Sequence, residues 1–191
     1  MAHNIIMTRG AFMDTAKLRG WHIAGFFFTV ILGPLLHFTY EWSGDSFAVG
    51  LFSAVNESVW EHLKMLIVPM LVSTLIEYIF YGRRIACFLP VRLLSILLGM
   101  LVIITVFYTY TGILGKSYVV VDIILYFVAV YLSFRYSYLR LESGESCSYF
   151  VHVLAAMGLL LLAAAVVVFT LNPPEIPLFQ DPLTGAYGIL R

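Results

Sequence analysis

Five long apolar runs constrain the fold of this chain more than any other feature of its sequence. They cover about residues 21–40, 58–81, 91–111, 117–138 and 148–170. A bilayer core about 30 Å thick needs roughly 20 mostly apolar residues in a helix, because hydrocarbon contains no water to satisfy free backbone groups. The sequence therefore predicts an all-α fold, a polytopic membrane helix bundle of about five transmembrane helices that forms a single integral membrane domain over residues 1–191.

Composition excludes two other classes of protein. Hydrophobic residues make up 61% of the chain and charged residues 12%, whereas soluble domains carry about 25% charged residues. Eleven Lys and Arg residues balance eleven Asp and Glu residues, so the basic surface that a nucleic-acid partner requires is missing. We expect the lipid bilayer to be the partner and no nucleic acid to bind.

The two cysteines, Cys87 and Cys147, lie far apart in the sequence and match no CxxC spacing. This arrangement favours neither a disulfide framework nor a zinc site. We therefore expect both cysteines to serve as packing residues.

Basic residues predict the orientation of the bundle. With the N-terminus in the cytoplasm, the outer segments hold only Lys116 and Arg191, and Lys64 falls within a span. Because cytoplasmic segments carry an excess of Lys and Arg, we expect the N-terminus inside and the C-terminus outside, in the cell membrane. The remaining basic residues then lie on the inner side: Arg9, Lys17, Arg19, Arg83, Arg84, Arg92, Arg135 and Arg140.

Ionisable residues within spans are costly, face the bundle interior and usually mark function. Three of the predicted helices carry such residues near their outer ends, within one or two helical turns of the same membrane face. They form the candidate polar site, which comprises His37, Glu41, Asn56, Glu57, Glu61, His62, Lys64 and Asp122.

Within this set, spacing indicates which side chains share a helix face. His37 and Glu41 are four residues apart, as are Glu57 and Glu61. Glu57 and Glu61 must share a proton, pair with Lys64 or bind a cation, because like charges at this spacing repel. Histidine with carboxylates suits zinc, manganese or iron, so His37, Glu57, Glu61 and His62 are the candidate metal ligands. The pattern is compatible with a divalent metal as cofactor and selects none.

The same residues also have a structural interpretation. Ser58 and Glu61 have the spacing of a capping box, in which Glu61 would bond back to the cap residue. Lys64 would then snorkel to the headgroups, and Glu41 would lie in water. At the other end of the second span, we expect Glu77 to pair with Arg83 or Arg84.

Two segments outside the spans have sequence patterns that predict their structure. Residues 43–46 read as a turn, and the apolar stretch 47–55 as a short interfacial or re-entrant element. The extracytoplasmic tail, residues 172–191, holds four prolines and several large apolar residues. We expect it to pack back onto the membrane face, where Glu175 or Asp181 would add a carboxylate.

The string N-E-S-x-W-E-H-x-K at residues 56–64, with His37, Tyr40 and Trp42-Ser43-Gly44 upstream and PPEIPLFQDP at 173–182, resembles small bacterial multi-pass membrane proteins of a domain-of-unknown-function family. The resemblance extends over most of the chain. It implies a bacterial cell membrane and assigns no activity.

Three functions compete. The first is binding or transport of a cation or small cationic solute. The second is a metal-dependent membrane-embedded enzyme that acts on a lipid or lipid-linked substrate, with a glutamate as general base. The third is a structural or interaction role without a ligand. Five helices are few for a complete transport path in one monomer, so a transporter of this size is expected to be a homo-oligomer. The sequence names no dimer face, because Gly99, Gly112 and Gly158 form no GxxxG pair.

Overall fold

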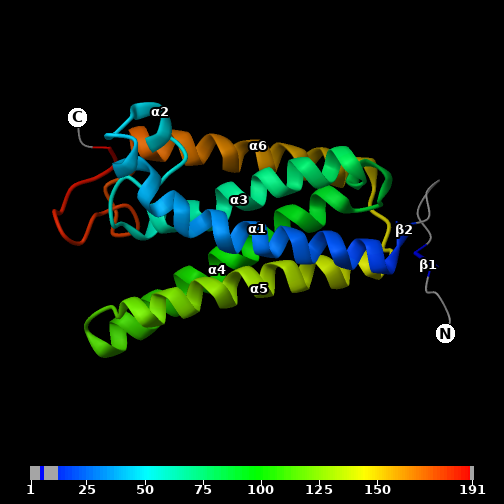
Figure 1. Ribbon diagram of the computed structural model, residues 1–191, viewed down its shortest axis with the longest axis horizontal. Coiled ribbons are helices and arrows are strands. Elements are labelled where there is room, and N and C mark those ends of the chain that lie inside the picture. The colour runs from blue at the N-terminus through cyan, green and yellow to red at the C-terminus, as the bar shows by residue number, and fades with distance from the viewer. Residues whose placement is uncertain (1–4, 7–12, 190–191) are drawn as a thin grey trace.

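The chain folds into a bundle of long helices whose two ends differ in structure (Figure 1). A computed structural model describes residues 5–6 and 13–189. Five of its helices are long and apolar enough to cross a membrane, which confirms the all-α prediction and the number of predicted spans. These helices are α1 (Thr15–Trp42), α3 (Val59–Phe80), α4 (Phe88–Leu114), α5 (Val119–Glu142) and α6 (Tyr149–Leu171).

Four short elements accompany the long helices. A strand pair precedes α1, formed by β1 (Ile5–Ile6) and β2 (Met13–Asp14). Helix α2 (Phe47–Gly50) follows α1, and the 3-10 turn η1 (Gly82–Arg84) joins α3 to α4. Figure 1 places the N-terminal strands at one end of the bundle, and α2 with the C-terminal segment at the other.

Helix α1 begins six residues earlier than the apolar run predicts, since it starts at residue 15 rather than 21. The side chain of Asp14 explains this start, because it accepts a hydrogen bond of 3.0 Å from the Ala16 amide and so caps the helix. The helix ends at the predicted turn, where Gly44 and Asp45 adopt positive φ angles. The first span is therefore longer than the bilayer requires.

Helix α3 lies at the centre of the bundle and contacts α1, α4 and α6. Half of its most apolar window is buried, compared with 17–39% for the other four long helices. The core around it is built from Leu63, Leu66, Ile67 and Met70, which are fully buried. Polar residues on α3 are therefore forced to find partners inside the protein.

Glycine allows the close approach of two helix pairs. A Cβ atom at Gly33 of α1 would overlap with the Tyr126 hydroxyl of α5, and one at Gly99 of α4 would overlap with Ser133 of α5. Small residues at such crossings let backbones pack closely, which is how helices associate where no hydrophobic effect drives them together.

The cysteine prediction was wrong, because Cys87 and Cys147 form a disulfide. They lie 60 residues apart in sequence, but their Cα atoms are 5.1 Å apart. The bond joins the residue before α4 to the segment before α6, at the same end as the N-terminus of α1.

Two residues used for the orientation, Arg9 and Arg191, lie outside the described part of the chain.

The C-terminal tail folds back onto the bundle. Phe179 is buried and packs against Trp60 and Phe169, with ring centroids 5.1 Å apart in both pairs. The Trp60 amide donates to the Leu178 carbonyl at 2.9 Å, so the tail satisfies a free amide in the first turn of α3. The tail is thus part of the end of the bundle at which α3 begins.

Replacing Phe179 with alanine tests this docking. Removing a buried aromatic side chain costs about 3 kcal/mol or more, so we expect a lower free energy of unfolding in detergent and faster proteolysis within residues 172–189. Leu183→Ala is the matched control, since Leu183 is 78% exposed. Equal behaviour of the two variants would show that the tail does not stabilise the bundle.

Candidate functional site

The site is built around the first turn of α3, where the chain passes from a loop into the helix. The Ser58 hydroxyl accepts a hydrogen bond of 3.3 Å from the Glu61 amide, and the Ser58 amide donates to Asn56 Oδ1 at 2.9 Å. Asn56 in turn donates through Nδ2 to the Gly188 carbonyl of the tail at 3.0 Å. Only half of the predicted capping box forms, because Asn56 takes the position that Glu61 would have used.

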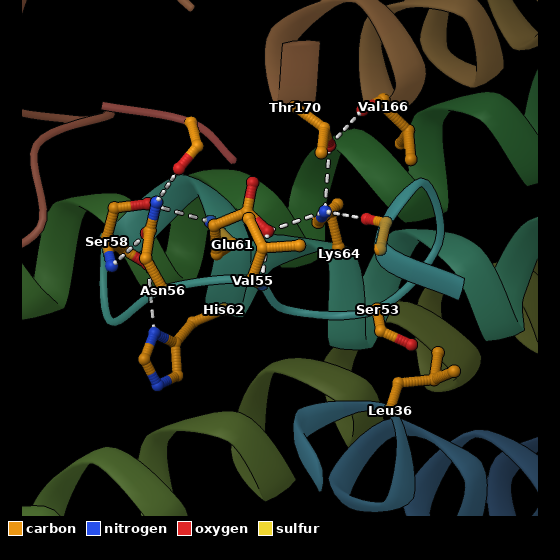
Figure 2. Close-up of polar contacts among 12 residues, drawn as sticks. Leu36, Ser53, Val55, Asn56, Ser58, Glu61, His62, Lys64, Val166 and Thr170 are labelled. Carbon is orange, nitrogen blue, oxygen red and sulfur yellow. Dashed lines mark hydrogen bonds and ion pairs between the residues drawn. The ribbon is translucent and has the colours of Figure 1, made fainter. Parts of the chain in front are cut away.

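Glu61 instead forms a buried ion pair with Lys64 (Figure 2). Lys64 Nζ lies 2.5 Å from Glu61 Oε2, and both side chains are at most 2% exposed. The same carboxylate oxygen accepts the Val55 amide at 2.9 Å. Of the three sequence-based alternatives for the glutamates, pairing with Lys64 accounts for Glu61.

Lys64 has a partner for each of its three N–H groups. Besides Glu61, Nζ donates to the Gly50 carbonyl at 3.2 Å and to Thr170 Oγ1 at 2.8 Å. These partners come from α2 and from the last turn of α6. The ammonium group therefore ties three elements together and does not snorkel to the surface.

Glu57, His37 and His62 form a second and more open cluster. His37 Nε2 lies 3.7 Å from one Glu57 carboxylate oxygen, and His62 Nε2 lies 3.6 Å from the other. One ligand atom from each residue falls within 4.8 Å of the other two, an arrangement that can hold a metal ion. Their side chains are 26–42% exposed, so water reaches the cluster.

The backbone orients one of the two histidines. His62 Nδ1 lies 2.9 Å from the Ser58 carbonyl, which can only accept a hydrogen bond, so Nδ1 carries a proton and Nε2 is the atom that a neutral ring can offer to a metal. Metal-ligating histidines are oriented in this way by an outer partner. In Figure 2 the His62 ring points away from Glu61 and Lys64. The Nδ1 atom of His37 is buried and has no hydrogen-bond partner among the described residues.

The other predicted site residues lie outside this cluster. Glu41 is exposed and forms no ion pair within the described part of the chain. Asp122 of α5 accepts a hydrogen bond from the Tyr110 hydroxyl of α4. In the tail, Glu175 is exposed, and Asp181 is buried but accepts from Thr184 at 2.6 Å within its own turn.

A second buried charge cluster, which the sequence analysis missed, occupies the other end of α3. The expected partner of Glu77 was Arg83 or Arg84, and this was wrong. Both arginines are exposed, and Arg92 of α4 lies against Glu77 instead, with Nη2 3.6 Å from Oε1. Glu77 Oε2 accepts the Tyr81 hydroxyl at 2.6 Å.

Arg92 is fully buried and satisfies its guanidinium with hydroxyl groups. Its nitrogens donate to Thr74 at 3.0 Å, Ser73 at 2.7 Å and Ser137 at 3.5 Å. Ser137 also bonds to the buried His22 at 3.0 Å. The run of small hydroxyl residues on α3 and α5 was the sequence signal for this cluster, since such residues match the donors of a buried arginine.

Together these features define a class of protein, a multi-pass bundle of apolar helices compatible with a lipid bilayer, with polar clusters at both ends of a central helix. The chain belongs to a family described as "Family of unknown function (DUF6512)", which matches residues 11–189. No curated protein and no solved structure matches the chain.

We expect the buried Glu61–Lys64 pair to contribute to the free energy of unfolding. In Lys64→Met the Glu61 carboxylate stays buried without its cation, which costs about 3 to 5 kcal/mol for a broken buried pair. We expect that loss in the free energy of unfolding, measured by denaturant titration in detergent micelles.

The double variant Glu61→Gln with Lys64→Met is the informative comparison, because it removes both charges and should recover much of the loss. Lys17→Met, at an exposed lysine of α1, controls for the loss of a positive charge. If the single and double variants lost equal stability, the two side chains would not be coupled.

Proposed function

We propose that this protein binds a divalent transition-metal ion through His37, Glu57 and His62, at the end of the bundle where α3 begins. The observation that supports this is the convergence of three ligand atoms from two helices and the loop between them. A tetrahedral ion with bonds of about 2.0 to 2.1 Å holds its ligand atoms about 3.3 Å apart. The N–O separations of 3.7 and 3.6 Å run to different oxygens of Glu57, and one ligand atom from each residue lies within 4.8 Å of the other two, so the side chains must move inward to reach that geometry.

The donor set favours some ions over others. Two imidazoles with one carboxylate suit zinc, iron or manganese, whereas magnesium and calcium prefer oxygen ligands alone. Glu61 was also a candidate ligand, but its carboxylate already accepts from Lys64 and Val55. Three protein ligands leave the remaining coordination positions of the ion open to water or a solute.

The surroundings of the cluster favour binding over transport. Behind it lies the closed Glu61–Lys64 pair, and then the fully buried apolar residues Leu63, Leu66 and Ile67. An ion passing inward would have to break that pair and cross an apolar core, which is costly. A site that exchanges its ion with the aqueous phase is the simpler consequence of this arrangement.

An enzyme that acts on lipid is the second candidate. Open coordination positions on a metal at the membrane surface favour it, because such a metal can activate a bound water. Of the glutamates that could act as general base, however, Glu61 is held by Lys64 at 2.5 Å and its side chain is only 2% exposed. We therefore place the enzyme second to a binding protein.

The proposed orientation puts the metal cluster on the outer face of a bacterial cell membrane. Among the described residues, the opposite end carries Arg83, Arg84, Arg135 and Arg140, together with Lys17 and Arg19, whereas the cluster's end carries Lys116. This distribution supports an N-terminus inside, by the bias of basic residues toward the cytoplasm.

Metal titration of purified protein tests the proposed function. We expect about one equivalent of Zn²⁺ to bind. We expect His62→Ala to weaken binding by more than the roughly 10- to 100-fold that loss of an outer partner costs. His152→Ala is the matched control, since His152 belongs to α6 at the opposite end. Unchanged affinity in His62→Ala would overturn the proposal.

The state of the cysteines tests the orientation separately. If the N-terminal end faces the cytosol, its reducing environment opposes the Cys87–Cys147 disulfide seen in the structure and should hold both residues largely as thiols in growing cells. Acid quenching followed by labelling with a bulky maleimide should then add two labels, with the single Cys→Ser variants as calibration. A pair that stays unlabelled until it is reduced would place this end outside.

A further inference from the structure

A cavity of about 160 Å³ opens between α1 and α3 at the end opposite the metal cluster. Its lining comes from both helices, with Ala24 and Ile76 exposed at the surface and Gly25 and Glu77 buried. Apart from Ser73 and Glu77, the lining is apolar, and it includes Trp21 and Phe28. In the membrane, this opening faces lipid rather than water.

Glu77 brings unused hydrogen-bonding capacity to this cavity. Its side chain is 2% exposed, and Oε2 already accepts from Tyr81. Oε1 is buried and has no hydrogen-bond partner among the described residues. Arg92 Nη2, at 3.6 Å, is too far for a hydrogen bond and donates to Ser73 instead. Arg92 offsets the charge of this oxygen, but a buried acceptor without a hydrogen bond costs free energy, so a further donor here would be favourable.

Gly25 lets α1 pack closely against Glu77 and against Phe134 of α5. A Cβ atom at this position would lie 2.7 Å from Phe134 Cε1 and 3.0 Å from Glu77 Oε1. Gly25 and the side chain that carries the unpartnered oxygen both line the cavity.

The depth of the cavity fits a lipid headgroup. Glu77 lies three residues before the end of α3, about 5 Å along the axis at 1.5 Å per residue. Trp21 on the opposite wall is a residue type that sits at the membrane interface. Just beyond the helix end, Arg83 and Arg84 are exposed, where cationic side chains attract lipid phosphates.

We propose that this cavity binds a membrane lipid whose headgroup ends in a primary ammonium group, which donates a hydrogen bond to Glu77 Oε1. A primary ammonium has N–H donors and a charge that complements the carboxylate. The quaternary ammonium of a choline lipid has no N–H group and cannot satisfy this oxygen. The inference concerns the opposite end of the bundle from the metal cluster and does not depend on metal binding.

Tryptophan fluorescence can report on the cavity directly, because Trp21 lines it. Replacing the other two tryptophans in a Trp42→Phe, Trp60→Phe background leaves Trp21 as the only one. The protein is placed in phosphatidylcholine vesicles with a small fraction of brominated phosphatidylethanolamine, and then with the same fraction of brominated phosphatidylcholine. We expect the ethanolamine lipid to quench Trp21 at about tenfold lower mole fraction, which one charge-assisted hydrogen bond provides.

Two variants assign this preference to the cavity. Glu77→Gln removes the charge of the acceptor and should abolish most of the preference. Ala24→Phe fills the opening from its exposed side, leaves the Glu77–Arg92 pair in place and should also abolish the preference. Ile31→Phe is the matched control, since Ile31 is 61% exposed on the same helix, and it should retain the preference.

Equal quenching by the two brominated lipids would overturn the proposal. A preference that survives both Glu77→Gln and Ala24→Phe would also overturn it, because the lipid would then bind elsewhere. Stronger quenching by brominated phosphatidylglycerol than by the ethanolamine lipid would replace the ammonium with a hydroxyl donor and contradict the proposed headgroup. Should Glu77→Gln fail to fold, Ala24→Phe and its control decide the question.

Discussion

The buried charges of α3 are the constraint on which the rest of the structure depends. This helix is the most buried of the five, yet it carries Glu61 and Lys64 near one end and Glu77 near the other. An unpaired charge in such surroundings is strongly destabilising, so each must meet a partner. Arg92 of α4, the Gly50 carbonyl of α2 and Thr170 of α6 supply the partners. The positions of the neighbouring elements are therefore tied to α3.

The buried charges at the two ends of α3 are satisfied in different ways. At the end where α3 begins, Glu61 and Lys64 form a closed pair, sealed by α2 and by the tail around Phe179. At the other end, the hydroxyls of Ser73 and Thr74 accept from Arg92, and Glu77 Oε1 has no hydrogen-bond partner in the part of the chain that the structure describes. A closed pair contributes only structure, whereas the open acceptor can take a ligand.

Glu57 and Glu61 lie four residues apart, but Glu57 belongs to the candidate metal cluster and Glu61 to a buried structural ion pair. Glu57 precedes the cap residue Ser58, so its side chain leaves the helix and reaches His37 and His62 at the surface. Glu61 lies in the first turn and points into the protein, where Lys64 neutralises it. Similar residues at helical spacing thus end in different environments, because the helix begins between them.

Sequence reasoning predicted what depends on local pattern. Apolar run length gave the five spans, because the bilayer sets that length, and the spacing of Glu61 and Lys64 made their pairing one of the alternatives. Contacts between distant segments were harder to predict. Arg83 and Arg84 are nearer to Glu77 in sequence than Arg92 is, but the turn after α3 carries them to the surface. Cys87 and Cys147 meet only because α4 and α5 form a hairpin between them.

The candidate metal cluster depends both on local sequence pattern and on contacts between distant segments. The approach of Glu57 and His62 follows from their positions around the start of α3. The approach of His37 depends on the packing of α1 against α3, where Gly33 allows close contact with Tyr126 and the Met65 carbonyl. The sequence predicts that His37 and Glu57 lie at a similar depth near one membrane face, but no pattern within it predicts that the two side chains face one another.

We propose above that two histidines and one carboxylate form a metal site at the end of the bundle where α3 begins. X-ray absorption spectroscopy of the zinc-loaded protein tests it most directly, because multiple scattering identifies imidazole ligands. We expect two imidazole nitrogens at about 2.0 to 2.1 Å and a carboxylate oxygen at about 2.0 to 2.2 Å. A spectrum with a shell of oxygen atoms and no imidazole scattering would contradict it.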